Sequence, residues 1–282
     1  MTNSEFRQEL DRINNHFFLF TNNIPRLLFL FDNLSESPNS LQWCTLGMLQ
    51  RLLNSSIALH TLLPKYLENS VYDFAIGILI RPIALDGLIG MNLLRILKNG
   101  LSEKLEQEKL IDEVDHFCRG VLADGLVQTL QYFTQLKSNN LVEEDDLLKM
   151  YNHFAKEYSD FLFQPGGIDS IPKVRHSIEA KPFQHFDSVV KDQEMKAIAH
   201  SFYELYTIYS KYDHFGFLYF DVMNAERELK NDRISAAINL FVNHFANLCD
   251  LLQRVTPGNE TIDRIYLLSR DYLDEKQKGK NQ

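Results

Sequence analysis

Arg81 stands in the most apolar stretch of the chain, residues 75–97. In a helix, its neighbours three and four positions away would be Gly77, Ile78, Ala84 and Leu85. None of these is acidic, so a buried guanidinium here needs an acid on another helix, a backbone carbonyl or an anionic ligand. We therefore predict that Arg81 is either a ligand-binding residue or one half of a structural ion pair.

A second pair of candidates, Asp213 and His214, lies in an aromatic segment, residues 200–221. On a helical wheel, Asp213 falls on the apolar side and His214 on the polar side. A carboxylate on an apolar face needs a cation, so we hypothesise a buried contact between Arg81 and Asp213, with Asp86 as the rival acid. If they line one pocket with Arg81, Asp213 and His214 are the candidate catalytic acid and base. Otherwise the ion pair fixes the register of two helices.

The clearest non-helical segment spans residues 164–184, which contain two adjacent glycines and three prolines. The segment also carries Lys173, Arg175 and His176 in an otherwise acidic protein. Flexible backbone with local positive charge suits an anion such as a nucleotide or an RNA phosphate. These three residues are therefore candidate ligand-binding residues, and an ordinary solvated connection is the alternative.

Two helical spacings resemble metal-binding motifs. Glu113 and His116 form one Glu-x-x-His, but a di-iron bundle needs a second copy and further glutamates on facing helices. His200 and Glu204 are four residues apart, without the His-Glu-x-x-His of zinc proteases. We therefore predict no metal site and no other cofactor.

Composition predicts an all-α fold for this chain of 282 residues. Only 12 glycines and 8 prolines are present, and hydrophobic residues make up 45% of the sequence and recur at helical spacing. We predict a single domain over residues 1–282, a bundle of about eight helices with long central ones. A boundary between sub-domains, if the chain has one, is expected in the segment 164–184.

Two proline positions are predicted to shape these helices. The first helix, residues 4–20, should end before Asn22 and Asn23, with Pro25 opening a second short helix to Leu34. Pro82 should interrupt the long helix predicted over residues 69–98, because it lacks an N–H and its ring crowds the preceding turn.

Charge and cysteine usage limit the classes of function. The net charge of −9 argues against a general nucleic-acid surface. The spacing of the three cysteines, Cys44, Cys118 and Cys249, matches neither a disulfide framework nor a thiolate metal site. It is typical of reduced thiols. The acidic start of the chain is unlike a signal peptide, and residues 74–97 carry four polar or charged side chains, too many for a lipid-facing span. We expect a cytoplasmic protein without a membrane segment.

Two segments resemble a known group. These are Leu79-Ile80-Arg81-Pro82-Ile83-Ala84-Leu85-Asp86 and Tyr206-Thr207-Ile208-Tyr209-Ser210-Lys211-Tyr212-Asp213-His214. They resemble bacterial all-helical proteins of unknown function, which are similar in outline to the HEPN-type helical domains of toxin and abortive-infection systems. The resemblance covers roughly residues 41–98 and 200–255, and it implies an antiviral or RNA-directed role. The nuclease signature of those domains, an Arg followed by a His after four to six residues, is absent.

Two functions are therefore expected. The first is a non-enzymatic interaction or sensor module that binds a protein partner or a second copy of itself, in a bacterial defence or stress system. The second is a nucleotide- or RNA-directed enzyme with a pocket around Arg81, Asp213 and His214. The geometry of these three residues distinguishes the two.

Overall fold

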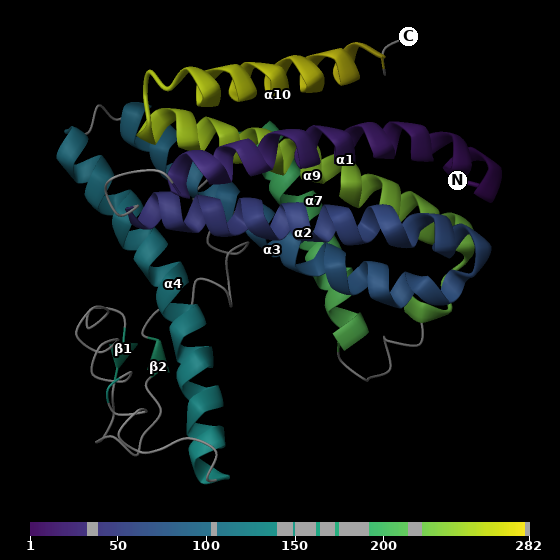
Figure 1. Cartoon of the computed structure of the whole chain (residues 1–282), viewed down its shortest axis with the longest axis horizontal. Helices are drawn as coiled ribbons and strands as arrows, with labels where there is room; N and C mark the ends of the chain where they lie inside the picture. The colour runs from purple at the N-terminus through teal and green to yellow at the C-terminus, as the bar shows by residue number, and fades with distance from the viewer. Residues whose placement is uncertain are drawn as a thin grey trace. The chain divides into compact units, whose positions relative to one another are not determined.

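The computed structural model describes residues 1–32, 39–102, 106–139, 149, 162–163, 173–174, 192–213 and 222–279. Seven α-helices lie within these residues: α1 (Asn3–Asp32), α2 (Ser40–Glu68), α3 (Asp73–Ser102), α4 (Gln107–Ser138), α7 (Gln193–Asp213), α9 (Arg227–Val255) and α10 (Glu260–Gly279) (Figure 1). A 3₁₀ turn, η1 (Ser70–Tyr72), precedes α3. A short antiparallel pair joins β1 (Leu162–Phe163) to β2 (Lys173–Val174). The predicted all-α class is confirmed, and the described helices number one fewer than the eight expected.

The chain divides into two compact units. The first comprises Met1–Lys98 and Phe183–Gln282, and the second comprises Asn99–Pro182. The second boundary lies between Pro182 and Phe183, near the end of the segment 164–184. Helices α1, α2, α7, α9 and α10 and most of α3 belong to the first unit, whereas α4 and the β1–β2 pair belong to the second.

Helix α1 is continuous through Pro25, so the predicted break at this proline is wrong. The side chain of Asn23 is buried and donates a hydrogen bond to the Leu19 carbonyl at 2.7 Å, instead of accepting one from a helix start. Ile24 and Leu27 are fully buried and continue the apolar face of the preceding turns. Tertiary burial along one face therefore holds the helix together across a residue that lacks an N–H.

Helix α2 begins with a reciprocal cap. The side chain of Asn39 accepts from the backbone N–H of Gln42 at 2.9 Å, and the Gln42 side chain accepts from the backbone N–H of Asn39 at 2.9 Å. This arrangement satisfies two N–H groups that the first helical turn leaves without partners. The cap therefore explains why α2 starts at residue 40.

Helix α3 continues through Pro82 and approaches two other helices closely at glycines. A Cβ atom on Gly87 would lie 2.4 Å from the ring of Phe202 in α7. A Cβ atom on Gly90 would lie 3.5 Å from Nδ1 of His244 in α9. The proline does not end the helix, because the turns that follow it are packed between α7 and α9, and residues 83–93 are all buried.

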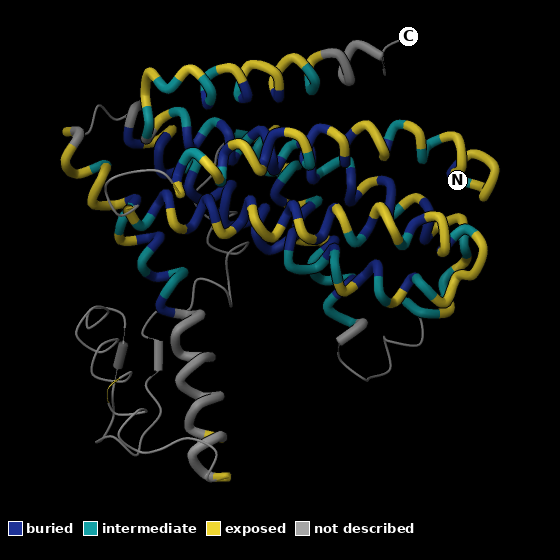
Figure 2. Tube along the Cα trace, in the orientation of Figure 1, coloured by how far each residue is buried: buried dark blue, intermediate teal, exposed yellow. Residues whose placement is uncertain are grey.

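Helix α9 is the central helix of the first unit and contacts α1, α2, α7 and α10. Its apolar residues are fully buried at intervals of three and four positions, as at Ile234, Ile238, Phe241 and Phe245. Figure 2 shows α9 largely buried, whereas the outer side of α10 is exposed. Near the start of α9, Lys230 forms an ion pair with Asp73 at 3.1 Å, and both side chains are at least nine-tenths buried.

One described helical stretch, Ser70–Gly100, is long and apolar enough to cross a membrane, with a mean hydropathy of 1.7. In its most apolar window, 67% of the residues are buried inside the protein. Core helices of soluble proteins meet the same criterion of length and composition, so this stretch is weak evidence for a membrane span.

Candidate functional site: the outer face of α3

Arg81 is half-buried, and its guanidinium lies over the ring of Tyr206 in α7, 5.5 Å from the ring centroid. The expectation of a fully buried cation is wrong, because continuous burial of α3 begins two residues later, at Ile83. A guanidinium over an aromatic face is attracted by the ring quadrupole while its edge can still meet water. The apolar neighbourhood of Arg81 is therefore compatible with its charge.

Asp86, the rival acid for Arg81, is a buried carboxylate in the middle of α3. Its side chain is 2% exposed, and Oδ2 lies 3.3 Å from Nε of Arg51 in α2. The Arg51 side chain is 51% exposed, so its charge remains partly hydrated while it neutralises the acid. This pair joins α2 to α3.

Most of the other predicted site residues lie outside the described part of the chain. The backbone of Asp213 ends α7 and that of Lys173 lies in β2, but their side chains are not among the described ones. His214, Arg175 and His176 lie outside the described residues altogether. The contact between Arg81 and Asp213 therefore stays a prediction.

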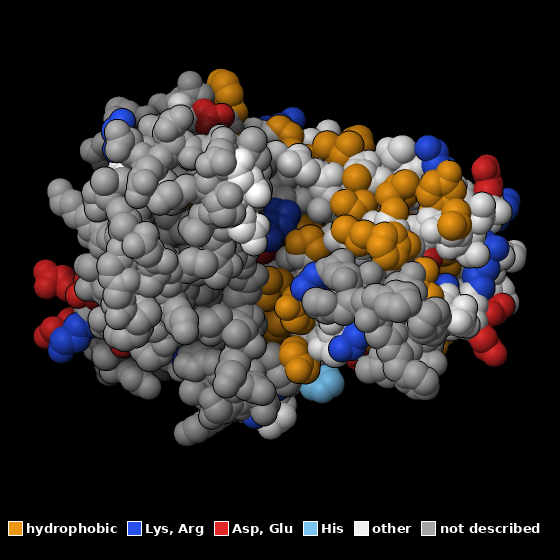
Figure 3. Space-filling view, turned by 90° about the horizontal axis from the view of Figure 1, so that it is seen from below, with side chains coloured by type: hydrophobic (Ala, Val, Ile, Leu, Met, Phe, Trp, Pro, Cys, Tyr) orange, Lys and Arg blue, Asp and Glu red, His pale blue; other side chains and the backbone are white. Residues whose placement is uncertain are grey.

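Arg81 continues a row of exposed hydrophobic side chains. Val71 of η1 is 67% exposed, and Phe74 and Ile78 of α3 are 37% and 41% exposed. Their spacing of three and four residues places them on one side of the helix, and Arg81 follows three residues later. We call these four residues the α3 face. Figure 3 shows exposed hydrophobic side chains gathered over part of the first unit, with basic side chains beside them.

The sequence did not predict this face because residues 74–80 are all apolar, so that hydrophobic residues occur on every side of the helix. Uniform apolarity gives no contrast between a helix side that packs against α7 and α9 and a side that remains exposed. Arg81 itself was the sequence feature that could have indicated the face. A cation on an apolar helix, with no acidic neighbour on that helix, favours a position at the edge of the buried region.

A second group that the sequence analysis missed is His244, on α9. Its ring is fully buried beside Gly90 and forms an edge-to-face contact with Phe202. Within the described structure, neither ring nitrogen has a hydrogen-bond partner. Burial, and secondarily the positive charge of Arg51, lowers the pKa of His244 from its ordinary 6.5 to about 3. The ring is therefore neutral at physiological pH.

The described residues contain no group of three or more His, Cys, Asp or Glu side chains placed to hold a metal ion. Glu113 and His116 are both exposed on α4, and His200 and Glu204 are both exposed on α7. Cys44, Cys118 and Cys249 are buried and form no disulfide. Burial raises the pKa of the Cys249 thiol, which opposes reactivity as a thiolate.

Comparison with profiles of protein families, with curated proteins and with solved structures finds no match to this chain. The resemblance to HEPN-type domains therefore remains a prediction from the two sequence segments. The case for function rests on the geometry of the described residues, above all on the α3 face.

Proposed function

We propose that this protein is a non-enzymatic interaction module that self-associates through the α3 face. The observation that carries the proposal is the exposed row of Val71, Phe74 and Ile78, which ends at Arg81 stacked on Tyr206. An apolar row bordered by an arginine and a tyrosine has the composition of the centre of a protein interface.

A second copy is the partner that this surface fits most simply. A twofold axis through the α3 face would pack each apolar row against its equivalent and leave the two Arg81 side chains at the rim. Fully burying one side chain of this kind contributes roughly 1.5–3 kcal/mol. A few such residues on each copy can therefore support a reversible dimer.

The proposed setting is the bacterial cytoplasm, where the module would act as a sensor or structural component of a defence or stress system. The resemblance to HEPN-type domains supports this setting, and so do the three buried cysteines, which form no disulfide. No contact among the described residues favours the alternative of a nucleotide- or RNA-directed enzyme, since Arg81 faces Tyr206 and the side chains of Asp213 and His214 lie outside the description.

Sedimentation velocity over a range of protein concentrations tests the proposal. We expect a concentration-dependent dimer for the wild type, and a dissociation constant raised at least about tenfold by Ile78→Glu, because the variant places a carboxylate in the apolar contact. The matched control is Leu267→Glu, which changes another exposed apolar residue on α10 and should leave the dimer intact.

Two results would contradict the proposal: a wild type that is monomeric at every concentration, and equal weakening by the two glutamate variants. Flotation with anionic vesicles checks the other apolar partner. Vesicle binding by the wild type that Ile78→Glu abolishes would assign the α3 face to a lipid surface.

A further inference from the structure

A groove of about 610 Å³ opens between α7 and α9 of the first unit, with Leu273 of α10 at its edge. Four residues of α7 line it, at positions 201, 204, 205 and 208, the spacing of one helix face. The opposite wall is formed by residues 232–243 of α9. The groove is separate from the α3 face, and its volume is in the range of small-ligand sites.

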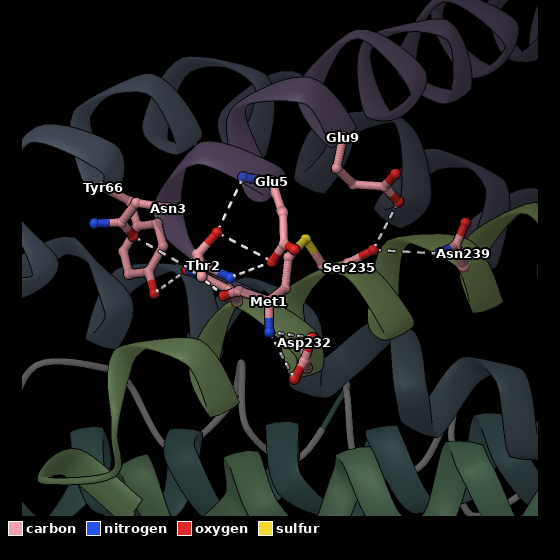
Figure 4. Close-up of polar contacts among 10 residues, drawn as sticks. Met1, Thr2, Asn3, Glu5, Glu9, Tyr66, Asp232, Ser235 and Asn239 are labelled. Carbon is pink, nitrogen blue, oxygen red and sulfur yellow. Dashed lines mark hydrogen bonds and ion pairs between the residues drawn. The ribbon is translucent and has the colours of Figure 1, made fainter.

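The α9 wall of the groove carries a row of polar side chains that form hydrogen bonds with residues of α1. Ser235 donates to Oε1 of Glu9 at 2.8 Å, and the amide nitrogen of Asn239 donates to Ser235 Oγ at 3.4 Å (Figure 4). Oδ1 of Asn239 is 3.2 Å from Nε2 of His16, whose Nδ1 is 2.6 Å from the Tyr272 hydroxyl. This chain of hydrogen bonds orients Ser235 and Asn239 before any ligand arrives.

Part of the groove lining is apolar. Leu205 is 5% exposed, and Ile208 and Leu240 are half-buried beside it. These branched side chains offer a surface for an aliphatic or aromatic group, whereas the polar row on α9 offers hydrogen bonds to amide or hydroxyl groups.

Two opposite charges line the groove without neutralising each other. Glu204 of α7 and Arg233 of α9 both border the cavity, and in the described structure neither side chain forms an ion pair. Asp232, the other acidic residue in the lining, lies 3.1 Å from the Met1 ammonium group. The carboxylate of Glu204 and the guanidinium of Arg233 are therefore both available to a ligand.

We infer that the groove binds a small zwitterion with an apolar body, namely an apolar amino acid or a short apolar peptide. The ligand's ammonium group faces Glu204, its carboxylate faces Arg233, and its side chain lies on Leu205. An uncharged apolar molecule would leave both charges unused, and a purely anionic ligand would bring its charge close to Glu204.

Isothermal titration with leucine, dileucine and trileucine tests the inference and separates the amino acid from the peptide. We expect at least one of the three to bind, and its affinity to fall about tenfold when the ammonium is acetylated or the carboxylate is amidated. Arg233→Gln should lower the affinity for the zwitterion by a similar factor and leave the affinity for the amidated form unchanged. Glu204→Gln should lower the affinity for the zwitterion and leave the affinity for the acetylated form unchanged.

The controls are Arg264→Gln on α10 and Glu194→Gln on α7, which remove exposed charges outside the groove lining. They should leave the affinity unchanged, and thermal melts should show all four variants folded. Absence of binding by all three probes overturns the inference, and so does binding that is insensitive to Glu204→Gln and Arg233→Gln. Because the α3 face does not contribute to the groove, the sedimentation result does not affect this outcome.

Discussion

The buried ring of His244 should make the stability of the first unit depend on pH. In the folded protein its pKa is lowered to about 3, mainly by burial, whereas in the unfolded chain it has the ordinary value of 6.5. Below pH 6.5 the unfolded chain therefore binds a proton that the folded protein does not. The stability is complete above pH 6.5 and is lost progressively as the pH falls toward 3.

The loss of stability at pH 5 depends little on the exact pKa of His244 in the folded protein. At pH 5, one and a half units below the unfolded value, the free energy of unfolding should be lower by about 2 kcal/mol, at about 1.4 kcal/mol per pH unit. This figure holds as long as the folded ring stays neutral at pH 5, and the pKa of about 3 satisfies that condition.

The assay is urea denaturation of the wild type and of His244→Leu at pH 7.5 and pH 5. Acid affects many groups, so the informative quantity is the difference in unfolding free energy between the two proteins. We expect this difference to shift by about 2 kcal/mol in favour of the leucine variant on going to pH 5. His60→Leu, which removes an exposed ring on α2, is the matched control. Parallel pH profiles for the wild type and His244→Leu would refute the reasoning.

Two further predictions concern packing and charge in the first unit. Gly87→Ala should lower the free energy of unfolding by about 1–3 kcal/mol in urea titrations, because the new Cβ would lie 2.4 Å from the ring of Phe202. Gly47→Ala, whose Cβ would meet nothing within 4 Å, should instead raise it by about 0.5–1 kcal/mol, and equal effects would contradict the packing explanation. Asp73→Asn should cost about 3–5 kcal/mol in calorimetry, because it leaves Lys230 buried without its carboxylate. The double variant with Lys230→Met should recover part of that loss, and strictly additive losses would show that the two side chains are not coupled.

Hydrophobic periodicity predicted much of the fold. The long helix predicted over residues 69–98 corresponds to α3, Asp73–Ser102, whose apolar residues continue over many turns. Proline rules were less reliable. Pro25 and Pro82 both lie inside continuous helices, because the backbone hydrogen bond lost at a proline costs less than exposing the apolar faces at a break in the helix.

For the candidate site, the sequence identified Arg81 as unusual but not its surroundings. The stacking on Tyr206 depends on where α7 passes α3, more than a hundred residues away along the chain. Asp86 likewise pairs with Arg51, a residue of α2 that the sequence analysis did not consider. The groove lined by Glu204 and Arg233 has no sequence motif, since each of its walls is an ordinary helix face.

By itself, the sequence determined the all-α class, because hydrophobic periodicity is a local property that neighbouring residues share. Only the tertiary structure decided which side of α3 stays exposed, which cation meets Asp86 and which charges border the groove. Those outcomes depend on distances between helices, and the glycines at positions 87 and 90 help to set them by letting α7 and α9 approach α3 closely.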